Sequence, residues 1–460
     1  MFTTGVKGLD ELIGVMRAPY TVLVAGHPGA GKTTLASTMC YENALRGNKC
    51  LYVSFYEDKE KLYRYMERLG IKLSEAESKN TVKFLKLPTS LDLESLIEVL
   101  SKNIEEGFDV IVIDSVNVLL EAAKDQAEKR AWLLNYFYQL PSLVNGLLIL
   151  VSELPFGEEK IGLGSIEFVV DAMLVLKHRI EDRLLVRLLE VRKARGAPLY
   201  VAEVPFTIAE NKGVEILLAP RLCGLPGEGE PIEVICSALR NRIDHIHKNH
   251  FINIFYHPGA VYGADDLVIL LAYAVKYNWK VLVLSYVSPP DLLEDALLLN
   301  LERHSLKREV AKKVVNKYFL FTALNPYAYS IHELALREQA ILSRVNPDIV
   351  VFHGTHALIG LNFAQHFKTL YNEVLSLKSK HIGVVRIGNC IDEARCNAES
   401  SISDLTIKYE PLIVGNEFKF KLSVFRRFRE PFIVTREEFL KCIEECIEVI
   451  RQEASKLEAA

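Results

Sequence analysis

A short glycine-rich segment near the N-terminus has the residue types and the spacing of a phosphate-binding loop. Residues 26–33 read GHPGAGKT, which fits the order G-x-x-x-x-G-K-[ST]. In this order the glycines let backbone N–H groups approach a phosphate, the lysine reaches the β- and γ-phosphates, and the hydroxyl binds Mg²⁺. The sequence therefore predicts a site for ATP and Mg²⁺. The residues expected to contact the nucleotide are Gly26, His27, Pro28, Gly29, Ala30, Gly31, Lys32, Thr33 and Thr34.

One carboxylate is placed to complete the magnesium site. Asp114 ends VIVID, an apolar run with the character of a buried strand. In α/β folds ligands bind outside the carboxyl ends of parallel strands, so Asp114 is expected beside the loop. We expect Thr33 and Asp114 to hold the ion, the aspartate through the water shell of the ion. Asp109 precedes the same run and is expected at the opposite edge of the sheet.

The elements that must position these residues alternate between strand and helix patterns. An apolar run begins at Tyr20 and leads into the loop, and a helical pattern follows as far as Leu45. This is the context in which a helix N-terminus can face a phosphate. Further apolar runs separated by helical patterns imply right-handed strand–helix–strand units. The predicted fold class is α/β, with two tandem domains that each contain a mostly parallel sheet flanked by helices.

The chain of 460 residues has two halves with the same order of elements. A single core rarely grows beyond roughly 250–300 residues, so two domains are expected. Residues 220–231, PRLCGLPGEGEP, contain three prolines and three glycines, which break both helix and strand. We predict a first domain at 1–222, a linker at 223–231 and a second domain at 232–460. The second domain ends in a long helix that begins at a capping box, Thr435–Glu438.

The second half contains a counterpart of the loop without its chemistry. Residues 256–267, YHPGAVYGADDL, repeat the tetrapeptide HPGA about 230 residues after its first copy. Tyr262 takes the position of the lysine in an alignment without a gap. With two residues inserted, Asp265 and Asp266 fall where phosphate would lie, and carboxylates repel phosphate. His353 also replaces the acid at the strand end, so we predict no ATP turnover in this half.

Longer segments of the first half carry further motifs. They are TTGVKGLDELIG, GHPGAGKTT, LYVSFYED, VIVIDS, and VLKHRIEDRLLVRLLEVRKARGAP followed by PFTI, and together they resemble the KaiC-like branch of the RecA superfamily of ATPases. The resemblance implies RecA-like domains, the second one degenerate, and a P-loop ATPase that forms a homo-oligomer, commonly a hexameric ring with nucleotide between subunits. In that pattern a lysine and an arginine reach the γ-phosphate of the neighbouring subunit. Lys193 and Arg195 occupy those positions here.

The residue that orients the attacking water departs from the family pattern. Relatives usually have two adjacent glutamates after the second strand, and the first of them polarises the water. Here Tyr56 takes the first position and Glu57 follows it. Neighbouring strand residues point to opposite faces, so Glu57 can replace that carboxylate only if the strand end is irregular. Glu57 is the predicted catalytic base, Glu153 is the second candidate, and slow hydrolysis or none is an open alternative.

Composition limits the classes of partner and location. Half of the residues are apolar and a quarter are charged, as in globular proteins, and the net charge of −4 gives no overall attraction for nucleic acid. No apolar run approaches the roughly 18–20 residues of a membrane helix. The N-terminus, MFTTGVKGLDEL, lacks the pattern of a signal peptide. We therefore predict no membrane insertion and a cytoplasmic location.

Three functions are compatible with these features. The leading prediction is a regulatory or assembly ATPase that hydrolyses ATP, quickly or slowly, in its first domain and uses its second for oligomerisation or for a protein partner that the sequence does not identify. A RecA- or RadA-like recombination or repair ATPase should carry basic DNA-binding loops. The candidate loop at 155–164 has two glutamates and one lysine, so DNA is not the favoured partner. A non-hydrolysing nucleotide sensor that controls a transcriptional or motility partner is the third function, and Tyr56 favours it.

Overall fold

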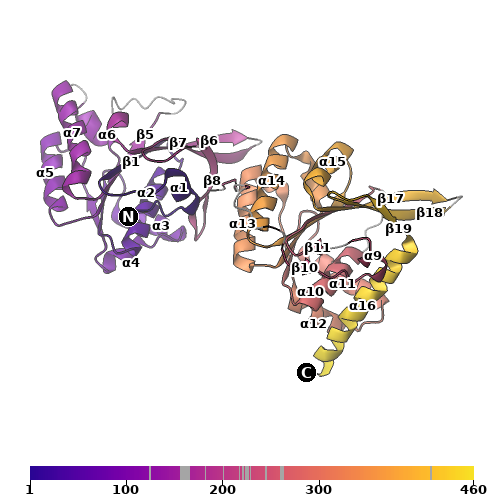
Figure 1. Cartoon of the computed structure of the whole chain (residues 1–460). Helices are drawn as coiled ribbons and strands as arrows, with labels where there is room; N and C mark the ends of the chain where they lie inside the picture. Colours follow the sequence, from indigo (N-terminus) through magenta and orange to yellow (C-terminus); the bar gives the residue numbers. More distant parts are fainter. Residues whose placement is uncertain are drawn as a thin grey trace. The chain divides into compact units, whose positions relative to one another are not determined.

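The chain forms two compact units, Met1–Leu218 and Ala219–Ala460. Each unit is α/β, with a mostly parallel sheet flanked by helices, which confirms the predicted fold class (Figure 1). The computed structural model describes the chain except for residues 124–125, 156–165, 182, 200, 217, 220–221, 223–226, 228, 244–245, 259–263, 415–416 and 460.

The first unit alternates helices and strands in the order expected from the sequence. Its helices are α1 (Lys7–Ile13), α2 (Lys32–Leu45), α3 (Lys59–Arg68), α4 (Leu73–Ser78), α5 (Leu93–Ile104), α6 (Asn117–Ala122), α7 (Ala127–Leu143) and α8 (Ile166–Val169). Its strands are β1 (Tyr20–Gly26), β2 (Cys50–Ser54), β3 (Val82–Lys86), β4 (Val110–Asp114), β5 (Leu147–Glu153), β6 (Ala172–Glu181), β7 (Leu184–Ala194), β8 (Glu203–Ala209) and β9 (Gly213–Ile216).

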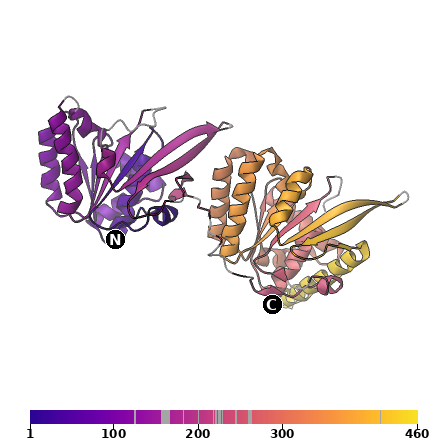
Figure 2. The ribbon, with the colours of Figure 1, turned by 45° about the horizontal axis from the view of Figure 1, so that its top comes forward.

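The sheet of the first unit has the order β3-β2-β4-β5-β1-β6-β7-β8-β9. Strands β1 to β6 pair in parallel, and β7, β8 and β9 continue the sheet in antiparallel pairs. Every residue of β1 is buried, because α2 packs on one face of the sheet and α5 and α7 pack on the other. Figure 2 shows the long β6–β7 hairpin extending beyond the sheet as a two-stranded ribbon.

The second unit repeats this architecture. Its helices are α9 (Ser237–Arg240), α10 (Asp265–Tyr277), α11 (Pro290–Arg303), α12 (Arg308–Tyr318), η2 (Pro326–Ala328), α13 (Ile331–Val345), η3 (Thr355–Gly360), α14 (Phe363–Ser379), α15 (Glu393–Ile402) and α16 (Arg436–Ala459). Its strands are β10 (Pro231–Ile232), β11 (Ile246–His247), β12 (Phe251–Tyr256), β13 (Val281–Ser285), β14 (Phe319–Ala323), β15 (Ile349–His353), β16 (Gly383–Asn389), β17 (Leu405–Val414), β18 (Glu417–Arg426) and β19 (Phe432–Val434).

The main sheet of the second unit has the order β14-β13-β15-β16-β12-β17-β18-β19. It matches the first sheet strand by strand: β12 corresponds to β1, β13 to β2, β15 to β4 and β16 to β5. The register matches as well, since Ser54 pairs with Asp114 in the first unit and Ser285 pairs with His353 in the second. Equivalent edges of the two sheets can therefore be compared residue by residue.

The C-terminal helix α16 packs within the second unit. The predicted capping box is present: the Thr435 N–H donates to the Glu438 carboxylate (2.8 Å), and the Glu438 N–H donates to the Thr435 hydroxyl (3.2 Å). One face of the helix contributes Ile443, Ile447 and Ile450 to the core of the unit. Within the part of the chain that the structure describes, no helix is both long and apolar enough to cross a membrane.

Candidate functional site

The predicted phosphate-binding loop connects β1 to α2. Gly31 precedes α2 with a φ of +104°, a left-handed conformation that strains residues with a side chain. A Cβ at Gly26 would come within 2.3 Å of the Leu176 carbonyl oxygen on β6. These two glycines are needed for the turn and for close packing, so the loop can point its N–H groups and the N-terminus of α2 at an anion.

The Lys32 side chain lies along the loop rather than in solvent. Its ammonium donates to the His27 carbonyl oxygen at 3.0 Å, and the residue is buried. Burial lowers the pKa of Lys32, and the nearby carboxylates of Glu153 and Asp114 oppose that shift. The positive charge is thus held at the loop, where phosphate oxygens would stabilise it.

The two predicted magnesium ligands meet directly. The Thr33 hydroxyl donates to Asp114 Oδ2 at 2.9 Å, and the Tyr52 hydroxyl donates to the same oxygen at 2.9 Å. Burial raises the pKa of Asp114, whereas these hydrogen bonds and the Lys32 charge lower it. A hydroxyl and a carboxylate at one point are the hard oxygen ligands that suit Mg²⁺. Tyr52 was not predicted from the sequence, because a tyrosine in an apolar strand gives no signal of a site.

The two candidate bases differ in their surroundings. Glu57 lies in the turn after β2, where its carboxylate pairs with Lys61 at 3.0 Å and its N–H donates to the Ser54 hydroxyl. Glu153 ends β5 opposite Gly26, and Asn117 hydrogen-bonds both its N–H and its carbonyl. Glu153 therefore borders the phosphate loop in the single chain, while the role of Glu57 stays a prediction.

Lys193 and Arg195 lie at the opposite end of β1 from the phosphate loop. Arg195 pairs with Asp171 at 3.0 Å, and the Asp171 carboxylate accepts from the N–H of Thr21, the second residue of β1. The Lys193 ammonium donates to the Glu167 carbonyl at 2.9 Å. Thr21 is five residues before Gly26, or about 17 Å along an extended strand. The two cations therefore cannot act on a phosphate held by the loop of their own chain.

Basic groups of β6 flank the loop, although the sequence predicts no role for them. The His27 and His178 rings are 6.3 Å apart, edge to face. Burial is the main cause that lowers the pKa of His27, followed by the charges of His178, Lys32 and Lys177. Lys177 also pairs with Glu190 at 2.7 Å. These residues place basic groups beside the loop, and acidic partners balance the charge of Lys177.

The equivalent edge of the second unit has different chemistry. His353 takes the place of Asp114, and burial lowers its pKa to about 4, so its imidazole is neutral near pH 7. Asp266, in the first turn of α10, is buried and accepts hydrogen bonds from the Tyr256 and Tyr409 hydroxyls. A cleft of about 390 Å³ at this edge has no lysine or arginine among its described lining residues.

Two loops with predicted roles lie mostly outside the described residues. The candidate DNA-contacting loop at 155–164 is described only at its first residue. The second HPGA loop is described at His257 and Pro258 and again from Ala264, so Tyr262 is not described. The predictions made for these loops stay predictions.

Comparison with known proteins finds relatives of the first half and of most of the chain. Residues 2–221 match the family model described as "ATPase: KaiC". The chain is similar to the circadian clock protein KaiC3 of Synechocystis sp., at 23% identity over 399 residues that cover 83% of this chain and 77% of the relative. It is also similar to a UPF0273 protein of Thermotoga maritima, at 27% identity over 46% of this chain and 94% of the relative. A shorter match is to the DNA repair protein RadA of Campylobacter jejuni, at 36% identity over 98 residues, 21% of this chain and 19% of the relative.

Proposed function

We propose that this chain, whose residues 2–221 match the KaiC ATPase family, binds ATP with Mg²⁺ in its first unit and hydrolyses it within a homo-oligomer. The second unit serves assembly or the binding of a protein partner. The observation that carries this proposal is the meeting of Lys32, Thr33 and Asp114 at the carboxyl edge of a parallel sheet.

The residues of the first unit have different roles in the proposed phosphoryl transfer. Loop N–H groups and Lys32 would hold the phosphates and balance their charge. Thr33 and Asp114 would hold Mg²⁺, which supplies further positive charge to the phosphate oxygens. Glu57, or Glu153 in its place, would orient the attacking water. Hydrolysis then depends on positioning and on charge stabilisation more than on covalent chemistry of the protein.

The site is incomplete in one chain, which supports the oligomeric part of the proposal. The predicted finger residues, Lys193 and Arg195, are at the far end of β1 from the loop. In a ring with head-to-tail contacts, the far end of one subunit can face the loop of the next. The two cations would then act on the γ-phosphate bound by the neighbour.

Mixing two inactive variants tests this arrangement. Lys32→Ala lacks a working loop, and a Lys193→Ala/Arg195→Ala double variant lacks working fingers. Mixed at equal amounts and allowed to exchange subunits, they should regain about a quarter of wild-type turnover, because about one interface in four pairs an intact loop with intact fingers. The matched control mixes Lys32→Ala with Asp114→Asn, whose defects lie in the same half of the site, and should regain nothing. No recovery in the first mixture, with mixed assemblies demonstrated by native mass spectrometry, would contradict action between subunits.

A nucleotide sensor without turnover is the second candidate, and a specific observation favours it. Tyr56, at the position of the usual glutamate, is 61% exposed, and the neighbouring Glu57 is paired with Lys61. Steady-state ATPase assays with and without single-stranded DNA separate the candidates. Turnover without DNA supports the regulatory ATPase, tight binding without turnover supports the sensor, and stimulation by DNA supports a RadA-like role.

A further inference from the structure

Three cysteine sulfurs converge in the second unit, away from the nucleotide edge. Cys236 immediately precedes α9, and Cys442 and Cys446 lie one turn apart on α16. The three sulfur atoms are all within 4.8 Å of one another, and all three residues are buried. Among the described residues, this is the one group of three or more histidine, cysteine or acidic side chains whose ligand atoms lie close enough together to hold a metal ion.

The surrounding structure holds the two segments together. The Glu445 carboxylate accepts from the N–H of Ser237 at 2.6 Å and from its hydroxyl, which ties the start of α9 to α16. Arg242 and Glu438 form an ion pair that joins the end of the α9 segment to the first turn of α16. These contacts hold α9 and α16 together independently of the disulfide that joins Cys236 to Cys442, so the three cysteine residues stay close when that bond is reduced.

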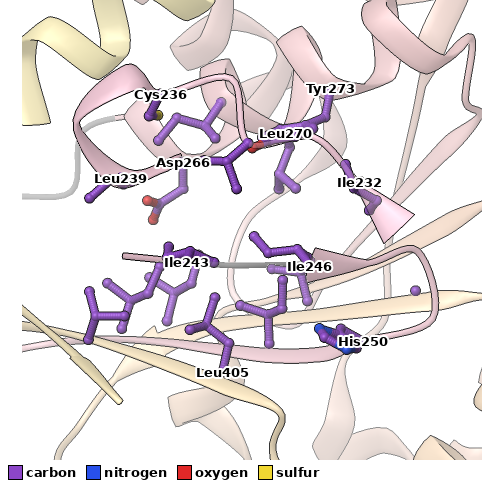
Figure 3. A pocket seen from close by; sticks show the side chains of 18 of the residues that line it. Ile232, Cys236, Leu239, Ile243, Ile246, His250, Asp266, Leu270, Tyr273 and Leu405 are labelled. Atoms are coloured by element: carbon purple, nitrogen blue, oxygen red, sulfur yellow. The ribbon is translucent and has the colours of Figure 1, made fainter. Parts of the chain in front are cut away.

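The cavity beside the sulfurs is mostly apolar. Cys236 and Cys442 line a cavity of about 150 Å³ whose other walls are mostly aliphatic, including Leu239, Ile243 and Leu270 (Figure 3). Asp266 also borders this cavity, but its carboxylate oxygens already accept from the Tyr256 and Tyr409 hydroxyls. The described lining also includes His247, Lys248 and His250, and none of them belongs to the group of sulfur atoms that lie within 4.8 Å of one another.

We propose that the reduced side chains of Cys236, Cys442 and Cys446 form a three-sulfur site for a soft monovalent cation, Cu(I). Thiolate ligands select Cu(I), zinc and iron–sulfur clusters over hard cations. Structural zinc sites take four protein ligands, whereas the described residues bring three together here. Each thiol that becomes a thiolate ligand releases one proton to solvent, and no electron is transferred. The ion would join α9 to α16.

The oxidised form of the same residues is a competing state. The structure pairs Cys236 with Cys442 as a disulfide and leaves Cys446 as a free thiol beside them. A thiol or phosphine reductant supplies the two electrons, and two protons from water complete the return of that disulfide to two thiols. Metal binding therefore requires reduction first, and oxidation of the pair would remove two of the three ligands.

A chelator competition tests the proposal on the full chain. The protein is reduced with a phosphine without oxygen and titrated into the coloured Cu(I) complex of bathocuproine disulfonate. Wild type should withdraw one more equivalent of Cu(I) than Cys446→Ser. Removing a group outside the ligand shell can weaken metal binding by roughly 100-fold. Removing a ligand should therefore weaken Cu(I) binding at this site by at least that factor. Cys50→Ser, which removes a buried thiol of the first unit, is the matched control and should keep this equivalent.

Thermal unfolding, omission of the reductant and competition by Zn²⁺ provide further tests of the site. Cu(I) should raise the unfolding temperature of the second unit in wild type and not in Cys446→Ala, which separates a lost ligand from a lost fold. Without reductant the equivalent should disappear. Equal Cu(I) binding by wild type and Cys446→Ser, binding that persists with the disulfide intact, or tighter binding of Zn²⁺ than of Cu(I) would each overturn the three-sulfur site. Lys32→Ala should bind Cu(I) normally, so this result is independent of the ATPase proposal.

Discussion

The carboxyl edges of the two sheets have the same strand order and register and opposite chemistry. The first edge presents a lysine, a threonine and an aspartate that converge at the start of α2. The second presents an aspartate turned inward onto two tyrosines and a neutral histidine at the strand end. The strand-to-helix connection is retained in both. The difference teaches that the scaffold depends on buried strands and helix faces, while a few edge residues decide whether phosphate can bind.

The second edge has replaced ligand contacts with contacts inside the protein. Tyr256 and Tyr409 stack with ring centroids 4.2 Å apart, and both hydroxyls donate to Asp266. A side chain that accepts these bonds is unavailable to a cation, and its charge disfavours phosphate. The carboxylate of the second edge is therefore hydrogen-bonded within the protein, at the place where the first edge is predicted to hold its ligand.

Replacing the loop lysine should have the largest effect on ATP turnover. Lys32→Ala should lower ATP turnover by roughly 10³-fold, because it removes a preorganised charge from the γ-phosphate. Tyr262→Ala, at the aligned position of the second loop, should leave turnover unchanged. ATPase rate and nucleotide affinity, measured on both variants with assembly checked by mass, provide the test. A substantial loss in Tyr262→Ala with assembly intact would refute the assignment of all turnover to the first unit.

The strand-end residues give the next largest contrast. Asp114→Asn should lower turnover by roughly 10²-fold or more and raise the Mg²⁺ concentration needed for half-maximal rate, because a charged oxygen near the ion becomes neutral. His353→Gln should change neither quantity. Rates measured over a Mg²⁺ titration compare the two. An unchanged Mg²⁺ requirement in Asp114→Asn would remove this residue from the metal site.

The two glutamates of the first edge are predicted to differ. Glu57→Gln should lower kcat by roughly 10²-fold if Glu57 serves as general base. Glu153→Gln should have a smaller effect on kcat and a larger one on KM, because the Glu153 charge supports the protonated state of Lys32. Single-turnover rates and ATP affinities separate these effects. A greater loss of kcat in Glu153→Gln would reverse the two roles.

The fold and the centre of the site were predictable because they depend on local patterns. Alternating apolar runs predicted the parallel sheets, and a contiguous motif predicted the loop that Lys32 and Thr33 belong to. Tyr52 was missed, since its contact with Asp114 depends on which face of β2 meets α2. The grouping of Cys236 with Cys442 was missed for a related reason: residues about 200 positions apart are brought together only by the packing of α16. Side-chain contacts between segments far apart in the sequence produce no spacing pattern from which they could be predicted.

Protonation of Asp266 gives the smallest and most local prediction. Its folded pKa is raised from 3.8 to about 6, with burial as the main cause. The folded state therefore binds more protons than the unfolded state between these values, so this group makes the second unit less stable as pH rises from about 4 to 6. The loss attributed to Asp266 is about 3 kcal/mol across that window. The Asp266→Asn variant should not show this loss of stability.

The measurement uses the two tryptophans of the chain, which lie in different units: Trp132 in the first and Trp279 in the second. In a Trp132→Phe background, Trp279 fluorescence reports urea unfolding of the second unit between pH 4 and 7. The stability of Asp266→Asn relative to its parent should rise with pH, because groups common to both proteins cancel in the difference. A difference that is flat with pH would mean that Asp266 stays ionised beside the tyrosines. Burial would then not raise the pKa of Asp266, and the second edge would hold a buried negative charge across this whole pH range.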